Sequence, residues 1–132
     1  MEQFNILIAG IPGSGKTTII EEIKSHLKEK TNIIDFRGHK LNLIEYKDNK
    51  DLNNIYGIIC LIDYNRKKES EEFCRYNDIK RINGNKTIQV CTKAPFNSYN
   101  NDIFYYEKNL LGQDIILEKI LDEINPIEDL KR

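Results

Sequence analysis

The stretch GIPGSGKTT (residues 10–18) decides the fold of this chain. It fits the pattern GxxxxGK[ST] through Gly10, Gly15, Lys16 and Thr17. The apolar run FNILIAG (residues 4–10) precedes it, and a segment of helical period begins at Lys16. Strand, glycine-rich loop and helix in this order are the context that a phosphate-binding loop requires. We therefore predict such a loop at residues 10–18.

The residue types in this loop suit an anion. Glycines let the backbone wrap closely, so the amides of residues 13–17 can point inward, and the start of the helix adds its positive end. Lys16 supplies a mobile cation, and the Thr17 hydroxyl is the kind of ligand that Mg²⁺ prefers. A ligand-free capping turn would need neither residue. The residues expected to contact a nucleotide here are Pro12, Gly13, Ser14, Gly15, Lys16, Thr17 and Thr18.

Composition restricts the class of protein. With 132 residues we expect a single domain over 1–132, and a net charge of −1 argues against a nucleic-acid partner or strong membrane binding. The three cysteines lie far apart without a CxxC pair, so we expect reduced thiols rather than disulfides or zinc. Signal-peptide, membrane-span, myristoylation and prenylation patterns are absent from the sequence. We expect a cytoplasmic protein without a membrane anchor, and a monomer.

Apolar runs alternate with segments of helical period, which is typical of an α/β fold. Strands are expected at residues 4–10, 56–64, 87–93 and 103–109. Helices are expected at 16–30, 70–82 and 113–124, with Ser70 as the N-cap of the second. The sequence thus predicts a three-layer arrangement, with a mostly parallel central sheet, one antiparallel edge strand and helices on both faces.

Residues 31–48 allow two interpretations. In the preferred one, residues 32–36 and 41–46 are antiparallel strands joined by a turn at 37–40, because 41–46 has β character and a weak helical face. In the other, NIID is a single parallel strand, followed by loop and poor helix up to Ile55. Under the hairpin interpretation, residues 47–55 form a polar loop or a single helical turn.

The order of elements resembles that of the Ras-like small GTPases, a family with the P-loop NTPase fold. CTKAP (residues 91–95) stands where that family has [NT]KxD, and IFYYEKN (103–109) stands in the place of its last strand. The resemblance implies binding of GTP or GDP with Mg²⁺, with Thr92 and the Lys93 stem flanking the purine and the loop near Glu107 and Lys108 closing the far side. Pro95 replaces the Asp that pairs with guanine, so ATP stays an alternative.

The family's DxxG motif has two candidate positions. Under the hairpin interpretation the motif falls on residues 45–48, where Glu45 would support Mg²⁺ and Asp48 replaces the glycine. Asn49 replaces the Gln that positions the attacking water. Hydrolysis should therefore be slow or absent. On the other register, DFRG followed by His39 is similar to translation-type GTPases. The catalytic candidates are therefore Lys16, His39 and Asn49, and the metal candidates are Thr17, Glu45 and Asp35.

Two other functions compete with this one. A small P-loop kinase would use Asp63 as its Walker B acid, but Arg66, Arg75 and Arg81 are interpreted as a solvated helix face rather than a lid. A nucleotide-binding pseudo-GTPase scaffold is favoured by Pro95 and Asp48. The segment between loop and hairpin is short, which disfavours a robust GTP-driven switch. The resemblance implies regulatory or effector proteins as partners.

Overall fold

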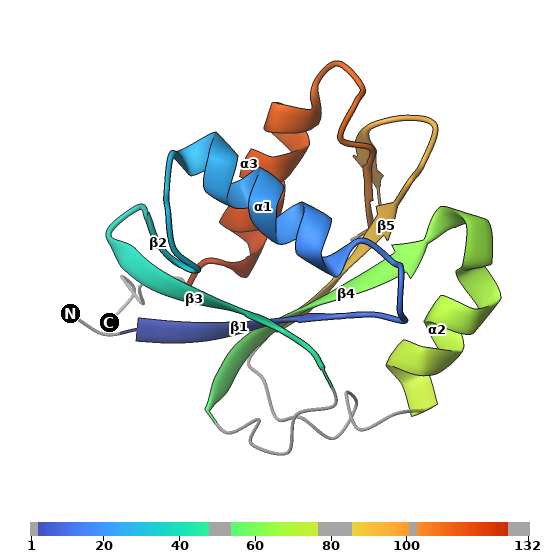
Figure 1. Ribbon diagram of the computed structural model, residues 1–132, viewed down its shortest axis with the longest axis horizontal. Coiled ribbons are helices and arrows are strands. Elements are labelled where there is room, and N and C mark those ends of the chain that lie inside the picture. The colour runs from blue at the N-terminus through green and yellow to red at the C-terminus, as the bar shows by residue number, and fades with distance from the viewer. Residues whose placement is uncertain (1–2, 48–53, 77–85, 101–102, 127–132) are drawn as a thin grey trace.

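The computed structural model describes residues 3–47, 54–76, 86–100 and 103–126 (Figure 1). Within these residues the chain forms a seven-stranded sheet in the order β2-β3-β1-β4-β5-β7-β6. The strands are β1 (Gln3–Ala9), β2 (Ile33–Phe36), β3 (His39–Glu45), β4 (Ile55–Asp63), β5 (Lys86–Thr92), β6 (Ser98–Asn100) and β7 (Ile103–Tyr106). The helices are α1 (Lys16–Leu27), α2 (Lys67–Tyr76) and α3 (Gln113–Ile124), with a 3-10 turn η1 (Tyr64–Arg66) before α2.

The sheet is mostly parallel, which confirms the predicted α/β class. Strands β3, β1, β4, β5 and β7 are parallel neighbours, whereas β2 and β6 pair antiparallel at the two edges. The sequence predicted an antiparallel strand at one edge only, and β6 was not expected. Because the carboxyl ends of parallel strands meet at one edge of a sheet, the segments after β1, β3, β4 and β5 lie together there.

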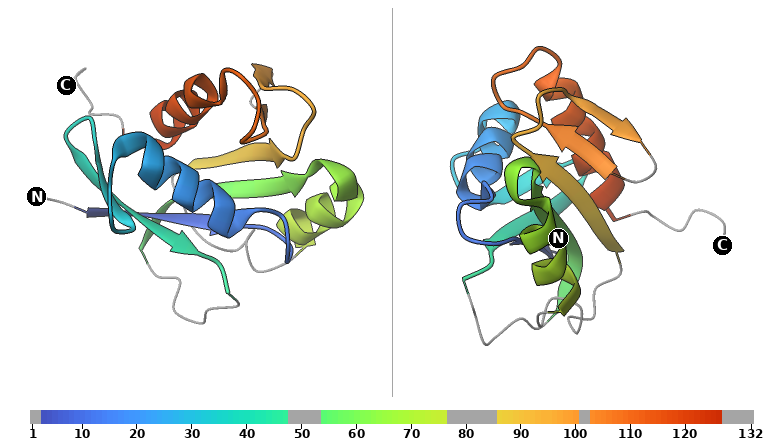
Figure 2. Two further views of the ribbon diagram at one scale, coloured as in Figure 1. Left: turned by 45° about the horizontal axis from the view of Figure 1, so that its top comes forward. Right: turned by 90° about the vertical axis from the view of Figure 1, so that its right-hand side faces the viewer.

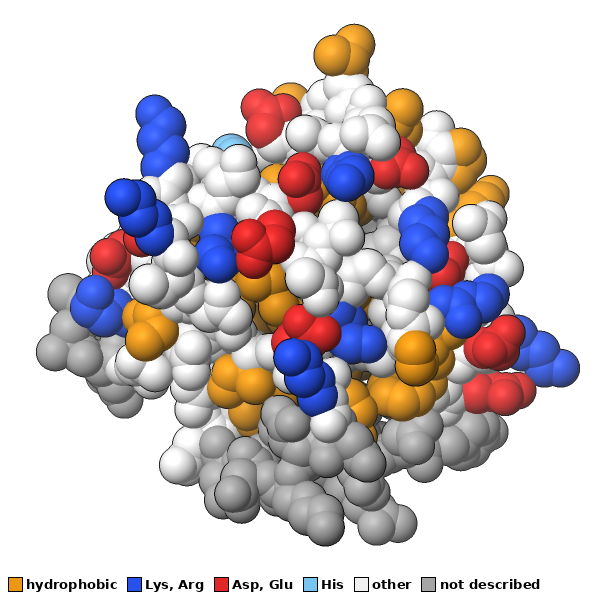
Figure 3. Space-filling model, in the orientation of Figure 1, with side chains coloured by type: hydrophobic (Ala, Val, Ile, Leu, Met, Phe, Trp, Pro, Cys, Tyr) orange, Lys and Arg blue, Asp and Glu red, His pale blue; other side chains and the backbone are white. Residues whose placement is uncertain are grey.

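Helices cover both faces of the sheet. One cluster of buried side chains joins the sheet to α1 and α3, with Ile19, Ile23, Leu117 and Ile120 among them. Helices α1 and α3 lie side by side over the sheet (Figure 2). A smaller cluster on the other face joins β1 and β4 to Phe73 of α2. Because β1 and β4 are covered on both faces, they are nearly continuous apolar runs. On the face shown in Figure 3, acidic and basic side chains are interspersed, as the near-balanced charge suggests.

The preferred hairpin is confirmed. Strands β2 and β3 pair antiparallel, with Phe36 opposite His39. The turn residues Arg37 and Gly38 both have positive φ, 49° and 85°, which suits a two-residue hairpin that follows the twist of the strands. The register of β3 on β1 then places Glu45 beside Ile8, at the carboxyl end of both strands.

Several predicted boundaries change. Helix α1 ends at Leu27 instead of residue 30, because Lys28 turns left-handed, with φ 57°, and closes the helix. Strand β4 begins at Ile55, which was expected in the loop.

The N-cap prediction for Ser70 is wrong. Helix α2 begins at Lys67, so Ser70 lies inside it, fully buried, and its Oγ accepts a hydrogen bond from the Asp63 amide. The rest of the helix predicted at residues 70–82 lies outside the described residues. No helix in the described part of the chain is long and apolar enough to cross a membrane.

Candidate functional site

The glycine-rich loop leads from the carboxyl end of β1 to the first turn of α1, as predicted. Gly13 and Gly15 have φ angles of 79° and 103°, a left-handed conformation in which any L side chain would be strained. Gly15 is also the N-cap residue of α1. The tight path of the loop therefore depends on glycine at these two positions.

Lys16 folds back over this loop. Its Nζ donates hydrogen bonds to the carbonyl oxygens of Gly10, at 2.8 Å, and Ile11, at 3.1 Å. Burial lowers the pKa of the Lys16 ammonium, and the Glu45 carboxylate nearby partly offsets this effect. The ammonium is thus held at the loop, next to a carboxylate at the end of β3.

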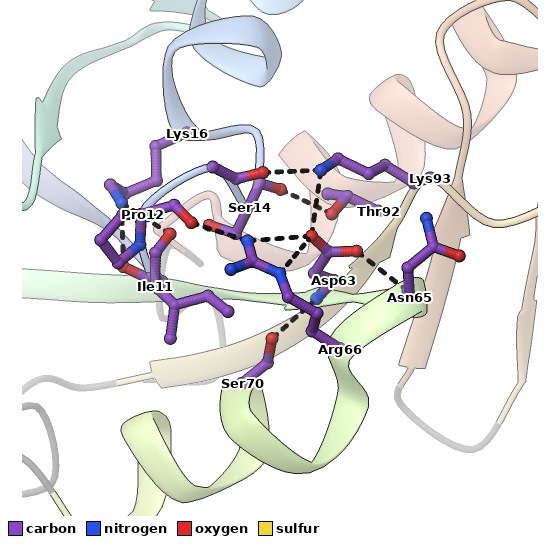
Figure 4. Close-up of polar contacts among 12 residues, drawn as sticks. Ile11, Pro12, Ser14, Lys16, Asp63, Asn65, Arg66, Ser70, Thr92 and Lys93 are labelled. Atoms are coloured by element: carbon purple, nitrogen blue, oxygen red, sulfur yellow. Dashed lines mark hydrogen bonds and ion pairs between the residues drawn. The ribbon is translucent and has the colours of Figure 1, made fainter.

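The next three carbonyls are held by side chains from the ends of β4 and β5 (Figure 4). The Pro12 oxygen accepts from Arg66 Nη2 at 2.6 Å, the Gly13 oxygen from Lys93 Nζ at 2.7 Å, and the Ser14 oxygen from Thr92 Oγ1 at 2.6 Å. From Gly10 to Ser14, every backbone carbonyl in the loop therefore accepts a side-chain hydrogen bond.

This pattern fixes the direction of the loop amides. The C=O and N–H groups of a trans peptide unit point in opposite directions. Because the carbonyls of Pro12 and Ser14 point toward β4 and β5, the N–H groups of Gly13 and Gly15 point away from those strands. The Gly13 and Gly15 amides and the Lys16 ammonium, which also contacts the Gly10 and Ile11 carbonyls, form a donor set that fits an anion.

Of the predicted metal ligands, the structure brings Thr17 and Glu45 together. The Thr17 Oγ1 donates to Glu45 Oε1 at 3.0 Å, joining the start of α1 to the end of β3. Among the described residues, no group of three or more His, Cys, Asp or Glu side chains is placed to hold a metal. Two hard oxygen donors nonetheless fit Mg²⁺, which keeps several waters and takes phosphate oxygens as further ligands.

Asp35 and His39 are not part of this site, so the alternative register is wrong. Both lie at the hairpin turn, beside the start of β1, whereas the loop follows the end of β1. Along a seven-residue strand this separation is about 20 Å. Asp35 pairs with Lys40 at 3.1 Å, and the His39 ring packs edge-on against Phe4.

Asn49, the catalytic candidate of the hairpin register, lies outside the described residues. Its predicted role as the residue that positions a water stays a prediction. The same holds for Asp48, which was expected in place of the small residue beside a terminal phosphate.

Two adjoining cavities meet at the loop and share Gly15, Thr18 and Lys93. One, of about 150 Å³, is lined by Ser14, Gly15, Thr18, Ile19, Thr92, Lys93, Tyr106, Glu107 and Lys108. The other, of about 260 Å³, is lined by Gly13, Gly15, Lys16, Thr17, Thr18, Glu45 and Lys93. The structure therefore brings the predicted Thr92, Lys93, Glu107 and Lys108 together beside the loop. Pro95 lies on the exposed surface and lines neither cavity.

Sequence reasoning missed the role of Arg66, which it placed on a solvated helix face. Its guanidinium instead contacts the Pro12 carbonyl and the buried carboxylate of Asp63. A signal was present, because Asp63 is the last residue of a buried strand and therefore lies at the carboxyl edge of the sheet. The spacing of three residues to Arg66 also allows a local ion pair.

A comparison of the sequence with models of known protein families and with curated proteins found no match.

Proposed function

We propose that this chain is a nucleotide-binding protein of the Ras-like small GTPase type, with the P-loop NTPase fold, that binds GTP or GDP together with Mg²⁺. The observation that carries the proposal is the hydrogen bonding of every loop carbonyl from Gly10 to Ser14 by a side chain. A turn that only capped a helix would not need these bonds. At the Pro12, Gly13 and Ser14 carbonyls these bonds favour a phosphate, because it binds to amide N–H groups and is repelled by carbonyl oxygens.

The two cavities support a division of the site. The larger cavity, with Lys16, Thr17 and Glu45, suits the phosphates and Mg²⁺. The smaller one, with Thr92, the Lys93 stem and the Glu107–Lys108 segment, suits the purine and ribose. Lys93 lines both cavities, so one side chain would serve both parts of the ligand.

Slow or absent hydrolysis is part of the proposal. One of the two water-positioning candidates, His39, lies at the opposite end of the sheet from the loop. The other, Asn49, lies outside the described residues and carries the amide of the expected Gln on a side chain shorter by one methylene group, so it would reach an attacking water less well. A binding protein that retains its nucleotide, including a scaffold that uses the ligand for stability, fits this site better than a rapid hydrolase.

A kinase is less well supported. Transfer of a phosphoryl group needs cations that can close over the phosphate, usually arginines on a lid. Arg66 is instead bound to the carboxylate of Asp63 and to the Pro12 carbonyl. The Asp63 carboxylate already accepts hydrogen bonds from Arg66, Lys93 and the Asn65 amide, so it is a poor candidate for a metal-supporting acid.

The proposal is tested first by releasing bound nucleotide from the purified protein with acid and identifying it. Guanine nucleotide is expected, and adenine nucleotide would refute the GTPase assignment. The second test is Lys16→Ala, which removes the ammonium at the loop and should weaken GDP binding by about tenfold or more. Lys24→Ala is the matched control, because Lys24 lies on the same helix but pairs with Glu21. Equal affinities of the two variants would show that the loop is not the site.

A further inference from the structure

Asp63 is a buried carboxylate at the end of β4, with 1% of its side chain exposed. Its Oδ1 accepts from the Asn65 amide at 2.9 Å, and its Oδ2 accepts from Arg66 Nε at 3.3 Å and from Lys93 Nζ at 3.0 Å. Burial by itself would raise the pKa of Asp63, but the hydrogen bonds from Lys93, Asn65 and Arg66 outweigh it and lower the pKa. The group is therefore an anion at neutral pH, held between two cations.

Each of these cations also holds the phosphate-binding loop. Arg66 Nη2 reaches the Pro12 carbonyl at 2.6 Å, and Lys93 Nζ reaches the Gly13 carbonyl at 2.7 Å (Figure 4). The two side chains come from different segments, one from the turn after β4 and the other from the end of β5. One carboxylate thus anchors two bridges to consecutive peptide units of the loop.

The bridges determine which way those peptide units face. With its carbonyl held toward Arg66, the Pro12–Gly13 unit must direct the Gly13 N–H to the opposite side. Without the bridge, this carbonyl could turn toward a bound phosphate, where its partial negative charge would be repelled. A β-carbon on Gly13 would lie 3.2 Å from Arg66 Nη2, so the guanidinium packs directly against the loop.

We propose that Asp63 and Arg66 are positioning residues for phosphate binding: Asp63 anchors Arg66 and Lys93, which hold the Pro12 and Gly13 carbonyls away from the ligand. The inference rests on the proposed function and adds a role for residues outside the loop motif. Arg66 acts on the peptide unit rather than on the phosphate, because its Nε and Nη2 are committed to Asp63 and Pro12.

A substitution at Asp63 tests the proposal, because the loss of its charge and the loss of its anchoring contacts predict opposite changes in anion affinity. Removing a negative charge close to a phosphate site should, by charge alone, tighten the binding of an anion. Loss of the anchor should weaken binding, because the loop carbonyls are no longer held aside. Asp63→Asn keeps the shape of the side chain and one oxygen that can accept from Asn65, but it removes the charge and puts an NH2 donor in place of the oxygen that accepts from Arg66 and Lys93.

The experiment measures the dissociation constants of pyrophosphate and GDP by titration calorimetry. Pyrophosphate has no base, so it reports on the loop without the cavity near Glu107. We expect Asp63→Asn to weaken the binding of both ligands about tenfold. Glu71→Gln, which removes an exposed carboxylate from α2, is the control and should leave both constants nearly unchanged. Equal or tighter binding by Asp63→Asn, with the control unchanged, would overturn the positioning role.

Arg66 supplies a second test that does not depend on a buried substitution, because its side chain is 37% exposed. Arg66→Met should weaken pyrophosphate binding about tenfold, and Arg66→Lys, which keeps one cation for Pro12 or Asp63, should recover part of the loss. If Arg66→Met and Arg66→Lys both bind pyrophosphate as tightly as the wild type, the inference fails even if Asp63→Asn does not fold. If the wild-type protein binds neither ligand, the proposed function fails as well, so the two failures are distinguishable.

Discussion

Glu45→Gln should reduce the effect of Mg²⁺ on nucleotide affinity. In the structure Glu45 ends β3, and its Oε1 accepts a hydrogen bond from Thr17 Oγ1 at 3.0 Å. A magnesium ion bound by the Thr17 hydroxyl would thus lie next to this carboxylate. Gln keeps the length and an acceptor oxygen, so the substitution tests the charge and leaves the packing of the side chain in place.

The magnitude follows from the distance. Mg²⁺ lies about 2 Å from a ligand oxygen, so a carboxylate that holds one of its waters is about 4 Å to 5 Å from the ion. At 4 Å two unit charges attract by about 1 kcal/mol in water, so a carboxylate and a divalent ion attract by about 2 kcal/mol. An energy of this size corresponds to about a thirtyfold change in an equilibrium constant.

The measurement is the ratio of the GDP dissociation constant in EDTA to that in excess Mg²⁺. We expect the ratio to fall about thirtyfold in Glu45→Gln. Affinity in EDTA should rise slightly, because a negative charge near the phosphates is gone. Asp35→Asn is the matched control, since Asp35 is the acid of the rejected register and pairs with Lys40 at the far end of the sheet. A ratio unchanged in Glu45→Gln but reduced in Asp35→Asn would refute this reasoning.

The remaining predictions concern stability. Gly57→Ala would place a β-carbon 2.7 Å from Cδ1 of the buried Ile124, and should cost about 1 kcal/mol to 3 kcal/mol in urea unfolding. Adding Ile124→Val should recover part of the loss, and a double variant no more stable than Gly57→Ala would contradict this packing. Asp63, whose native pKa is lowered, contributes stability in full above about pH 4, where an unfolded Asp is ionised, and loses it as pH falls toward the native pKa. The stability gap between wild type and Asp63→Asn should therefore narrow from pH 5 to pH 2, and a constant gap would contradict the lowered pKa.

Short-range sequence patterns correctly predicted several elements of this fold. The bounds of α3 were predicted correctly, because Ile116, Leu117, Ile120 and Leu121 define one buried helical face and Asn125 and Pro126 follow its end. The loop at residues 10–18 and its neighbours β1 and α1 were predicted from one motif, because strand, turn and helix there are contiguous in sequence.

Features that depend on pairing between distant segments were harder to predict. The four residues DFRG fit a family motif, yet the register of β3 on β1 places them far from the loop. Strand β6 is three residues long and lies at the sheet edge beside β7, so its sequence carries little periodicity of its own. Both outcomes are set by the partner strand, which a single sequence does not reveal.

In the candidate site, the part proposed for phosphate and the part proposed for the base are formed by different groups of the protein. A sequence motif therefore does not predict both parts equally well. In the proposed phosphate part, loop amides would bind phosphate through backbone geometry, for which glycines and one lysine are the sequence signature. The side chains that support this geometry, Arg66, Lys93 and Thr92, come from the ends of neighbouring strands and need only supply donors, so many residue types can fill these positions. Lys93 joins the two parts, because it donates to Gly13 and lines both cavities. A change at Lys93 should therefore affect base and phosphate binding together, whereas a change at Arg66 should affect phosphate binding alone.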